Sequence, residues 1–219
     1  MSDAEHRSEE PVSHPFFARM YLRTASKRGL EGEDRYRRTL LAGVRGRVIE
    51  VGAGNGLNFL FYPPAVQQVL AVEPEPTLCA AAVESAAGAP VAISVVDGVS
   101  GLLPAEDESF DTGVASLVLC SVPDQDRALA ELYRVIRAGG ELRFYEHVLA
   151  ERPMWARLQR LADVTIWPRV GRGCHLSRDT AASIERAGFT IESRDRFVFT
   201  PGGLIPPLPY ILGSARRGA

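Results

Sequence analysis

Glu50-Val51-Gly52-Ala53-Gly54-Asn55-Gly56 is the most informative stretch of this 219-residue chain. Its first two residues end an apolar run, Arg47–Val51, that leads directly into the glycines. An apolar run followed by glycines predicts a buried strand that ends in a tight loop. Glycine has no Cβ, so its backbone can turn sharply and lie directly against a bound molecule. The dinucleotide-binding fingerprint spaces its glycines as GxGxxG. The GxGxG spacing after an acid therefore favours a nucleoside that carries an amino-acid tail over a pyrophosphate.

Four more apolar runs follow the glycine loop, and each reads as a strand of a parallel sheet covered on both faces. They are Val69–Glu73, Val91–Val96, Asp111–Leu119 and Glu141–Val148. Helical stretches lie between the strands or after them, at Thr77–Ala87, Asp124–Arg137 and Ser177–Ala187. Asp124 and Ser177 are the expected N-caps, and Gly188 is the expected end of the last helix.

The alternation of strand and helix stops near the C-terminus. Phe189–Phe199 and Tyr210–Arg216 both read as strands, and no helical pattern separates them. An antiparallel hairpin is therefore expected to complete an α/β doubly wound sheet.

Glu73 is a second indicator of a nucleoside site. It ends the second predicted strand about twenty residues after the glycine loop, where an acid can accept hydrogen bonds from both hydroxyls of a ribose. A single acid at a strand end is often only solvated, but the glycine loop before it favours ligand binding.

Composition excludes several classes of protein. Hydrophobic residues make up 46% and charged residues 24% of the chain, as in ordinary globular proteins, and the formal net charge is −2. No global basic field would attract nucleic acid or a membrane. The three cysteines, Cys79, Cys120 and Cys174, form no CxxC pair, and no metal-ligand cluster is apparent from the spacing. The first eleven residues are polar and no apolar run reaches bilayer length. We therefore expect a cytoplasmic protein that binds no metal, nucleic acid or membrane.

Several motifs together resemble a known family. EVGAGNG, the strand-end acid in AVEPEP, ESFD at Glu108–Asp111 and RVIRAGGELRFYEHV are similar to class I S-adenosylmethionine (SAM) methyltransferases of type 11, the ubiquinone-methyltransferase-like group. The similarity covers roughly residues 40–150. NFLFYPP, SLVLCSVPDQ, FYEHV and GCHLSRDT resemble more narrowly the methyltransferase-like branch whose animal members are thiol S-methyltransferases. That branch carries an N-terminal membrane anchor, which the sequence printed here does not show.

This resemblance implies a Rossmann-like, seven-stranded sheet in the order 3-2-1-4-5-7-6 with the seventh strand antiparallel. It also implies SAM as cofactor, S-adenosylhomocysteine as product, and a cofactor site over the carboxyl ends of strands 1, 2 and 4. The residues expected to bind the cofactor are Glu50, Gly52, Gly54, Gly56, Glu73, Pro74, Asp97, Gly98, Val99, Ser116 and Leu117. The usual Asp-Ala pair before Leu-Pro is replaced here by Val99-Ser100, so the partner of the adenine amino group stays open.

The expected organisation has four parts. Residues 1–13 read as a disordered leader and residues 14–41 as a helical lid. Residues 42–219 read as the methyltransferase domain, with residues 151–173 as an insertion that covers the substrate.

The expected reaction is methylation of a small apolar or heterocyclic thiol. A thiolate that attacks a sulfonium cation removes two charges, so a dry pocket favours the transition state. The candidate catalytic residues are Glu146, His147 and His175; His147 can titrate near neutral pH, but it can equally anchor a loop. Two alternatives remain: O-, N- or C-methylation of a small aromatic metabolite or quinone, and a SAM-binding protein without catalysis. The oligomeric state is undetermined.

Overall fold

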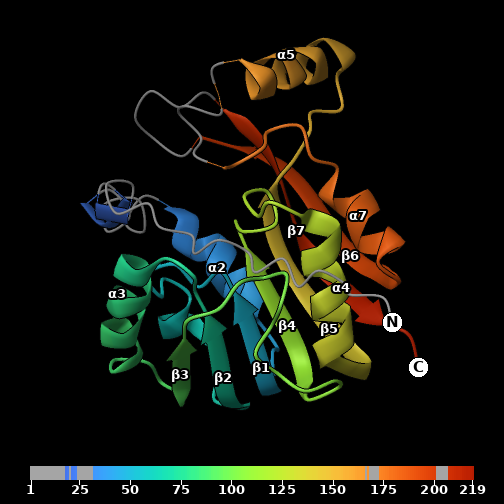
Figure 1. The fold of residues 1–219 in the computed structure, drawn as a ribbon. Helices are drawn as coiled ribbons and strands as arrows, with labels where there is room; N and C mark the ends of the chain where they lie inside the picture. The colour runs from blue at the N-terminus through green and yellow to red at the C-terminus, as the bar shows by residue number, and fades with distance from the viewer. Residues whose placement is uncertain (1–17, 20, 24–31, 166, 168–172, 201–206) are drawn as a thin grey trace, which may run out of the picture.

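A computed structural model describes residues 18–19, 21–23, 32–165, 167, 173–200 and 207–219. Its centre is a seven-stranded sheet in the order β3-β2-β1-β4-β5-β7-β6, as predicted (Figure 1). The strands are β1 (Gly46–Val51), β2 (Val66–Val72), β3 (Ile93–Val96), β4 (Phe110–Ser116), β5 (Ile136–His147), β6 (Phe189–Phe199) and β7 (Leu208–Arg217).

The directions of the strands also agree with the prediction. Strands β1 to β5 pair in parallel, whereas β7 runs antiparallel to both β5 and β6. Parallel neighbours need a crossover connection, while β6 and β7 follow each other along the chain and can pair as a hairpin. The strand order reverses between β1 and β4, and ligands bind at the carboxyl ends of strands at such a point in open α/β sheets.

The helices cover both faces of this sheet. They are α2 (Asp34–Leu41), η2 (Phe59–Phe61), α3 (Pro76–Ala86), α4 (Gln125–Val135), α5 (Pro153–Val164) and α7 (Thr180–Arg186). Figure 1 shows α3 beside β3, α4 and α7 over the other half of the sheet, and α5 apart from the sheet. Among the described residues, none of the helices combines the length and apolarity that a membrane span requires.

Two apolar clusters hold the layers together. One contains Leu129 and Leu132 of α4 and Ile184 of α7. The other contains Leu40 of α2 and Phe59 of η2. All five side chains are at most 1% exposed, so each face of the sheet has its own dry core.

The caps of two helices can be compared with the sequence prediction. Asp124 caps α4 as expected, because its Oδ1 accepts from the N–H of Arg127 at 2.9 Å. The expectation that Ser177 caps the last helix is wrong: α7 begins at Thr180, and Asp179 is its N-cap. Ser177 instead contacts the carboxylate of Asp163 in α5. The Ser177 hydroxyl, which the capping preference of serine assigns to the helix N-terminus, therefore contacts Asp163 and does not cap α7.

Strand β4 ends three residues before the predicted Leu119. Leu117 has a positive φ of 58°, a left-handed conformation that a strand cannot continue through. The N–H groups of Val118 and Leu119 donate to Glu146 and not to a neighbouring strand. The chain therefore leaves the sheet at Ser116.

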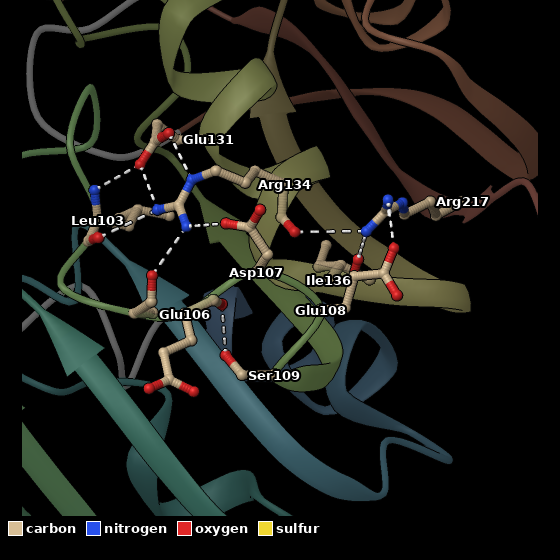
Figure 2. A network of polar contacts seen from close by, with 10 residues as sticks. Leu103, Glu106, Asp107, Glu108, Ser109, Glu131, Arg134, Ile136 and Arg217 are labelled. Atoms are coloured by element: carbon tan, nitrogen blue, oxygen red, sulfur yellow. Dashed lines mark hydrogen bonds and ion pairs between the residues drawn. The ribbon is translucent and has the colours of Figure 1, made fainter.

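An arginine in α4 holds the connection that leads into β4 (Figure 2). The Arg134 guanidinium donates to Glu131, to Asp107 and to the carbonyl oxygens of Leu103 and Ala105. The carbonyl oxygen of Arg134 in turn accepts from Arg217, near the C-terminus. These contacts tie the loop before β4 to α4 and β7.

The predicted lid segments lie partly outside the described residues. Within residues 14–41, the described residues 18–19 and 21–23 and the helix α2 are helical. Within residues 151–173, the helix is α5. The predicted leader, 1–13, lies wholly outside. That these segments move over a substrate stays a prediction.

Candidate active site

The glycine loop leaves β1 through three residues with positive φ: Gly52 (65°), Gly54 (59°) and Gly56 (79°). A Cβ on Gly52 would lie 2.2 Å from Val118, and one on Gly56 would lie 2.6 Å from the ring of Phe59. A Cβ on Gly54 would have nothing nearer than Tyr21 at 3.9 Å. Gly52 and Gly56 are therefore required by packing, whereas a Cβ on Gly54 would make only ordinary van der Waals contact with Tyr21.

Glu73 lies against this loop. It is 5% exposed; its Oε2 accepts from the N–H of Gly54 at 2.7 Å and its Oε1 from the N–H of Glu75 at 3.0 Å. Burial raises the pKa of this carboxyl, although both amide hydrogen bonds oppose the shift. An ionised carboxylate can accept about four hydrogen bonds, so two acceptor positions remain for a ligand.

Glu50 faces a network of side chains beneath the loop. Its two oxygens accept from Asn58 Nδ2 and from the Tyr62 hydroxyl, each at 2.7 Å. Asn58 Oδ1 accepts from Arg37 in α2 at 2.9 Å. Complete burial raises the pKa of Glu50 to about 6, against the lowering effects of Tyr62, Asn58 and Arg37. In this structure Glu50 thus joins β1 to the segment after the loop and to α2.

The other residues expected at the cofactor lie along the same edge of the sheet. Pro74 follows Glu73, and Asp97, Gly98 and Val99 follow β3. Asp97 is exposed, and Val99 forms an isolated bridge with Leu102. Ser116 ends β4 and Leu117 begins the turn after it.

Among the described residues, Asn55 Oδ1 in the glycine loop and Ser116 Oγ are polar atoms of this edge that are buried without a hydrogen-bond partner. A buried polar atom without a partner costs about 1–3 kcal/mol, and a bound ligand or water can remove that cost. These two atoms, the bare backbone at Gly54 and the two acceptor positions of Glu73 fit a polar nucleoside with an amino-acid tail.

Glu146 organises the loop after β4. It is fully buried, and its carboxylate accepts three backbone N–H groups, those of Val118 (3.0 Å), Leu119 (2.9 Å) and Cys120 (3.2 Å). Burial raises its pKa, while the amides and His147 oppose the shift. Glu146, which was predicted as a catalytic residue, therefore uses both carboxylate oxygens to hold this loop.

His147 meets two cysteines beside that loop. Its Nε2 lies 2.6 Å from Sγ of Cys174, and the ligand atoms of Cys120, His147 and Cys174 all lie within 4.8 Å of one another. Cys120 and His147 are buried and Cys174 is half-buried. The His147 Nδ1 is buried and has no hydrogen-bond partner. Contact with the Cys120 thiol, and then burial, raise the pKa of Cys174.

His175, the other predicted base, is exposed. Its backbone N–H donates to the carbonyl oxygen of Cys120 at 2.7 Å. The structure thus brings Glu146 and His147 together in the interior and leaves the His175 side chain at the surface.

A hollow of about 580 Å³ lies at the opposite edge of the sheet. Gly46, which begins β1, and Gly140, in the first half of β5, contribute to its lining together with Asp111 and Arg216. It is far along the strands from the glycine loop and is not part of this site.

Sequence reasoning missed two sets of residues in this region. Asn58 and Tyr62 satisfy Glu50, and a buried acid needs such donors within reach of its loop. His147 was predicted at the site, but its meeting with Cys120 and Cys174 left no spacing signal, because the three residues lie after β4, at the end of β5 and after α5.

Comparison with known proteins agrees with the fold. The family described as "Methyltransferase domain" matches residues 49–144. Thiol S-methyltransferase TMT1B of Rattus norvegicus is 36% identical over 172 residues, which cover 77% of this chain and 69% of the relative. The TMT1B protein of Homo sapiens is 34% identical over 180 residues, with 80% and 73% covered. An S-adenosylmethionine-dependent methyltransferase from Mesorhizobium loti has a similar structure, with a TM-score of 0.61 at 24% identity, covering 86% of this chain and all of that one.

Proposed function

Since this chain belongs to the class I SAM-dependent methyltransferases, we propose that it methylates the sulfur of a small, apolar or heterocyclic thiol. The strand order reverses between β1 and β4, and the glycine loop that Glu73 holds at this point supports a nucleoside site there. The relatives named above as thiol S-methyltransferases support the sulfur acceptor.

We assign the cofactor to the edge formed by the carboxyl ends of β1, β2 and β4. The backbone at Gly54 carries no side chain that would block a close approach, and the remaining acceptor positions of Glu73 suit the ribose hydroxyls. Asn55 and Ser116 offer polar atoms that lack partners. When bound, SAM supplies an electrophilic methyl group on a positively charged sulfur.

The hydrogen bonds and burial of Glu146 are the observation that favours a thiol as the acceptor. Its carboxylate holds three amides and is fully buried, so it has little capacity to remove a proton from an acceptor. A thiol with a pKa near ~8.5 is already a few per cent ionised at neutral pH and needs little help from a base. An alcohol or phenol has a higher pKa and needs more help from a base to lose its proton. A site whose buried acid is used for positioning therefore suits a thiol best.

The residues around this acid have complementary roles in the proposal. Glu146 positions the loop 118–120, and His147 lies on the acceptor side, within the interior. His175 lies at the rim, where it can contact an incoming acceptor. Exclusion of water around His147 favours the loss of charge in the transition state.

The same fold serves acceptors with oxygen, nitrogen or carbon nucleophiles, so an aromatic metabolite or quinone is the second candidate. A protein that binds SAM without catalysis is the third. One experiment separates them: the protein is incubated with SAM and a panel of thiols, phenols and amines of matched size, and the products are identified by mass spectrometry.

We expect methyl thioethers and S-adenosylhomocysteine in equal amounts. Turnover of phenols or amines with no turnover of thiols would overturn the thiol assignment. Binding of SAM with no product from any acceptor would favour the third candidate. As a check on Glu146, we expect Glu146→Gln to lower kcat on the best acceptor while leaving the Kd for SAM nearly unchanged, and Glu84→Gln, an exposed change in α3, to alter neither.

A further inference from the structure

The cluster of Cys120, His147 and Cys174 lies at the carboxyl edge of β4 and β5, beside the segment that ends with Ser116. We propose that these three side chains form a zinc site with one open coordination position, and that this position takes the acceptor thiol as a thiolate. The second half of the proposal rests on the proposed function; the first half does not.

The composition of the cluster points to zinc. Two thiolates and one imidazole are a ligand set that zinc binds in catalytic sites, where three protein ligands leave the fourth position open for water or substrate. Thiolate ligands select soft or borderline ions such as Zn²⁺ over Mg²⁺ and Ca²⁺. No carboxylate of the described residues belongs to the cluster, which also disfavours the hard ions.

The distances are close to those that the ion needs. With Zn–S near 2.3 Å and Zn–N near 2.0–2.1 Å, tetrahedral angles put ligand atoms about 3.6 Å apart. The three ligand atoms here lie within 4.8 Å of one another. The 2.6 Å from His147 Nε2 to Cys174 Sγ must lengthen by about 1 Å. Cys174 lies outside the helices and strands and is half-buried, so its side chain can make that change.

Contacts outside the cluster hold its members in place. The N–H of Cys120 donates to Glu146 Oε2, and its carbonyl oxygen accepts from the N–H of His175, next to Cys174. Arg178 donates to the carbonyl oxygen of Leu119 and to that of Val122. These bonds join the loop after β4 to the loop before α7. The two cysteines are thereby fixed facing each other, although they are far apart in sequence.

The side of the loop 173–179 away from the cluster is fixed as well. Asp163 in α5 accepts from the N–H of Leu176 at 2.7 Å and from that of Ser177 at 2.8 Å. His147 is held by β5, where it pairs with Tyr210 of β7 and meets its ring edge-on. The site is thus assembled by the fold, which lowers the entropic cost of binding an ion.

A metal here would serve the proposed reaction directly. A thiol that coordinates zinc gives up its proton to solvent, so the acceptor would arrive as a thiolate without a protein base. Its sulfur lone pair then forms a bond to the methyl carbon, and the old carbon–sulfur bond breaks with its electron pair left on the departing sulfur. One anion and one cation become two neutral thioethers. The product is a weaker ligand than a thiolate and leaves the open position.

The test measures metal and activity separately. The full chain is purified under a reductant that does not bind metal, loaded with one equivalent of ZnCl₂, desalted and analysed by inductively coupled plasma mass spectrometry. A parallel sample takes CoCl₂, because tetrahedral Co²⁺ with thiolate ligands has intense visible and charge-transfer bands. Cys120→Ser, Cys174→Ser and His147→Asn are compared with Cys79→Ser, whose cysteine lies in α3 and outside the cluster.

We expect close to one zinc per chain in the wild type and in Cys79→Ser, and at least a tenfold weaker Kd for zinc in each of the other variants. An added acceptor thiol should shift the Co²⁺ bands. A wild-type protein that keeps no zinc, or octahedral Co²⁺ bands, would overturn the site, and this result needs no variant to fold. Zinc retained in the folded Cys174→Ser protein would do the same. Zinc bound as expected, with no thiol methylated in the panel above, would overturn the proposed function and leave the metal site standing.

Discussion

The N–H of Gly54 donates to Oε2 of Glu73 across 2.7 Å, although the two residues lie 19 positions apart. The acid expected to bind a ribose therefore also holds the glycine loop that borders the ligand. Both functions depend on the negative carboxylate, because an amide at this position has one acceptor oxygen in place of two.

Glu73→Gln should accordingly weaken SAM binding about 10- to 100-fold, since hydrogen bonds to charged groups are worth about 1.5–3 kcal/mol. Isothermal titration calorimetry with SAM measures the change. Glu84→Gln on the exposed face of α3 is the matched control and should bind as the wild type does. Equal affinities for the Glu73 and Glu84 variants would remove Glu73 from the cofactor site.

Gly54 and Gly56 should respond differently to the same small substitution. Both have positive φ, so alanine costs each about 1–2 kcal/mol of backbone strain. At Gly56 the new methyl also meets Phe59 at 2.6 Å, whereas at Gly54 it makes ordinary contact with Tyr21 at 3.9 Å. Gly56→Ala should therefore lower Tm by several degrees more than Gly54→Ala, while Gly54→Ala should lose at least tenfold in SAM affinity. Thermal melts without ligand and calorimetry with SAM test both halves; SAM bound by folded Gly54→Ala as tightly as by the wild type would contradict the second.

Stability should depend on pH through Glu50. Its pKa is about 6 in the folded protein and 4.5 ordinarily, so the folded state holds the proton more tightly than the unfolded chain. The free energy of unfolding should then fall by about 2 kcal/mol from this group as pH rises from below 4.5 to above 6.

Urea unfolding of wild type and Glu50→Gln from pH 4 to pH 7.5 isolates this contribution. The difference in unfolding free energy between the two proteins should change across that interval, because the amide of the variant does not titrate. Glu73 and Glu146 also have raised pKa values. The contribution of Glu146 cancels in the difference, whereas the charge of Glu73 interacts with Glu50, so Glu73→Gln is measured in both backgrounds. Parallel profiles would show that Glu50 keeps an ordinary pKa in the folded protein.

Arg134 and Arg186 allow a comparison of two ion pairs. Arg134 is 30% exposed and contacts two acids and two carbonyl oxygens, as Figure 2 shows for most of these partners. Arg186 is 60% exposed, and its acidic partner Asp126 is 72% exposed. Arg134→Met should destabilise the protein by about 1–3 kcal/mol, because two carbonyl oxygens and Glu131 lose their donor. Arg186→Met should cost under about 0.5 kcal/mol. Denaturant melts compare the two; similar losses would mean that the Arg134 contacts contribute no more than a surface pair.

Much of the architecture could be predicted because it depends on short-range pattern. Apolar runs entering glycine, helical spacing between them and Glu73 at a strand end are all visible within about twenty residues. The hairpin of β6 and β7 followed from two strands with no helix between them. The order of the strands came from the family resemblance and was confirmed.

Two boundaries could not be predicted, because distant side chains set them. Glu146 withdraws the amides of residues 118–120 from the sheet, so β4 ends at Ser116. Asp163 accepts hydrogen bonds from Ser177, and α7 begins after Asp179. In both cases a carboxylate far away in sequence binds groups that the local pattern assigns to a strand or to a helix cap.

The sequence by itself determined the class of fold, the glycine loop and the acid that faces it, since hydrophobic period and glycine conformation act on neighbouring residues. Tertiary structure alone decided what Glu146 does and that Cys120, His147 and Cys174 meet. The three cluster residues lie after β4, at the end of β5 and after α5. Their side chains come together because parallel β4 and β5 end at one edge, and Arg178 and His175 join the loops there. No spacing along the chain encodes that meeting.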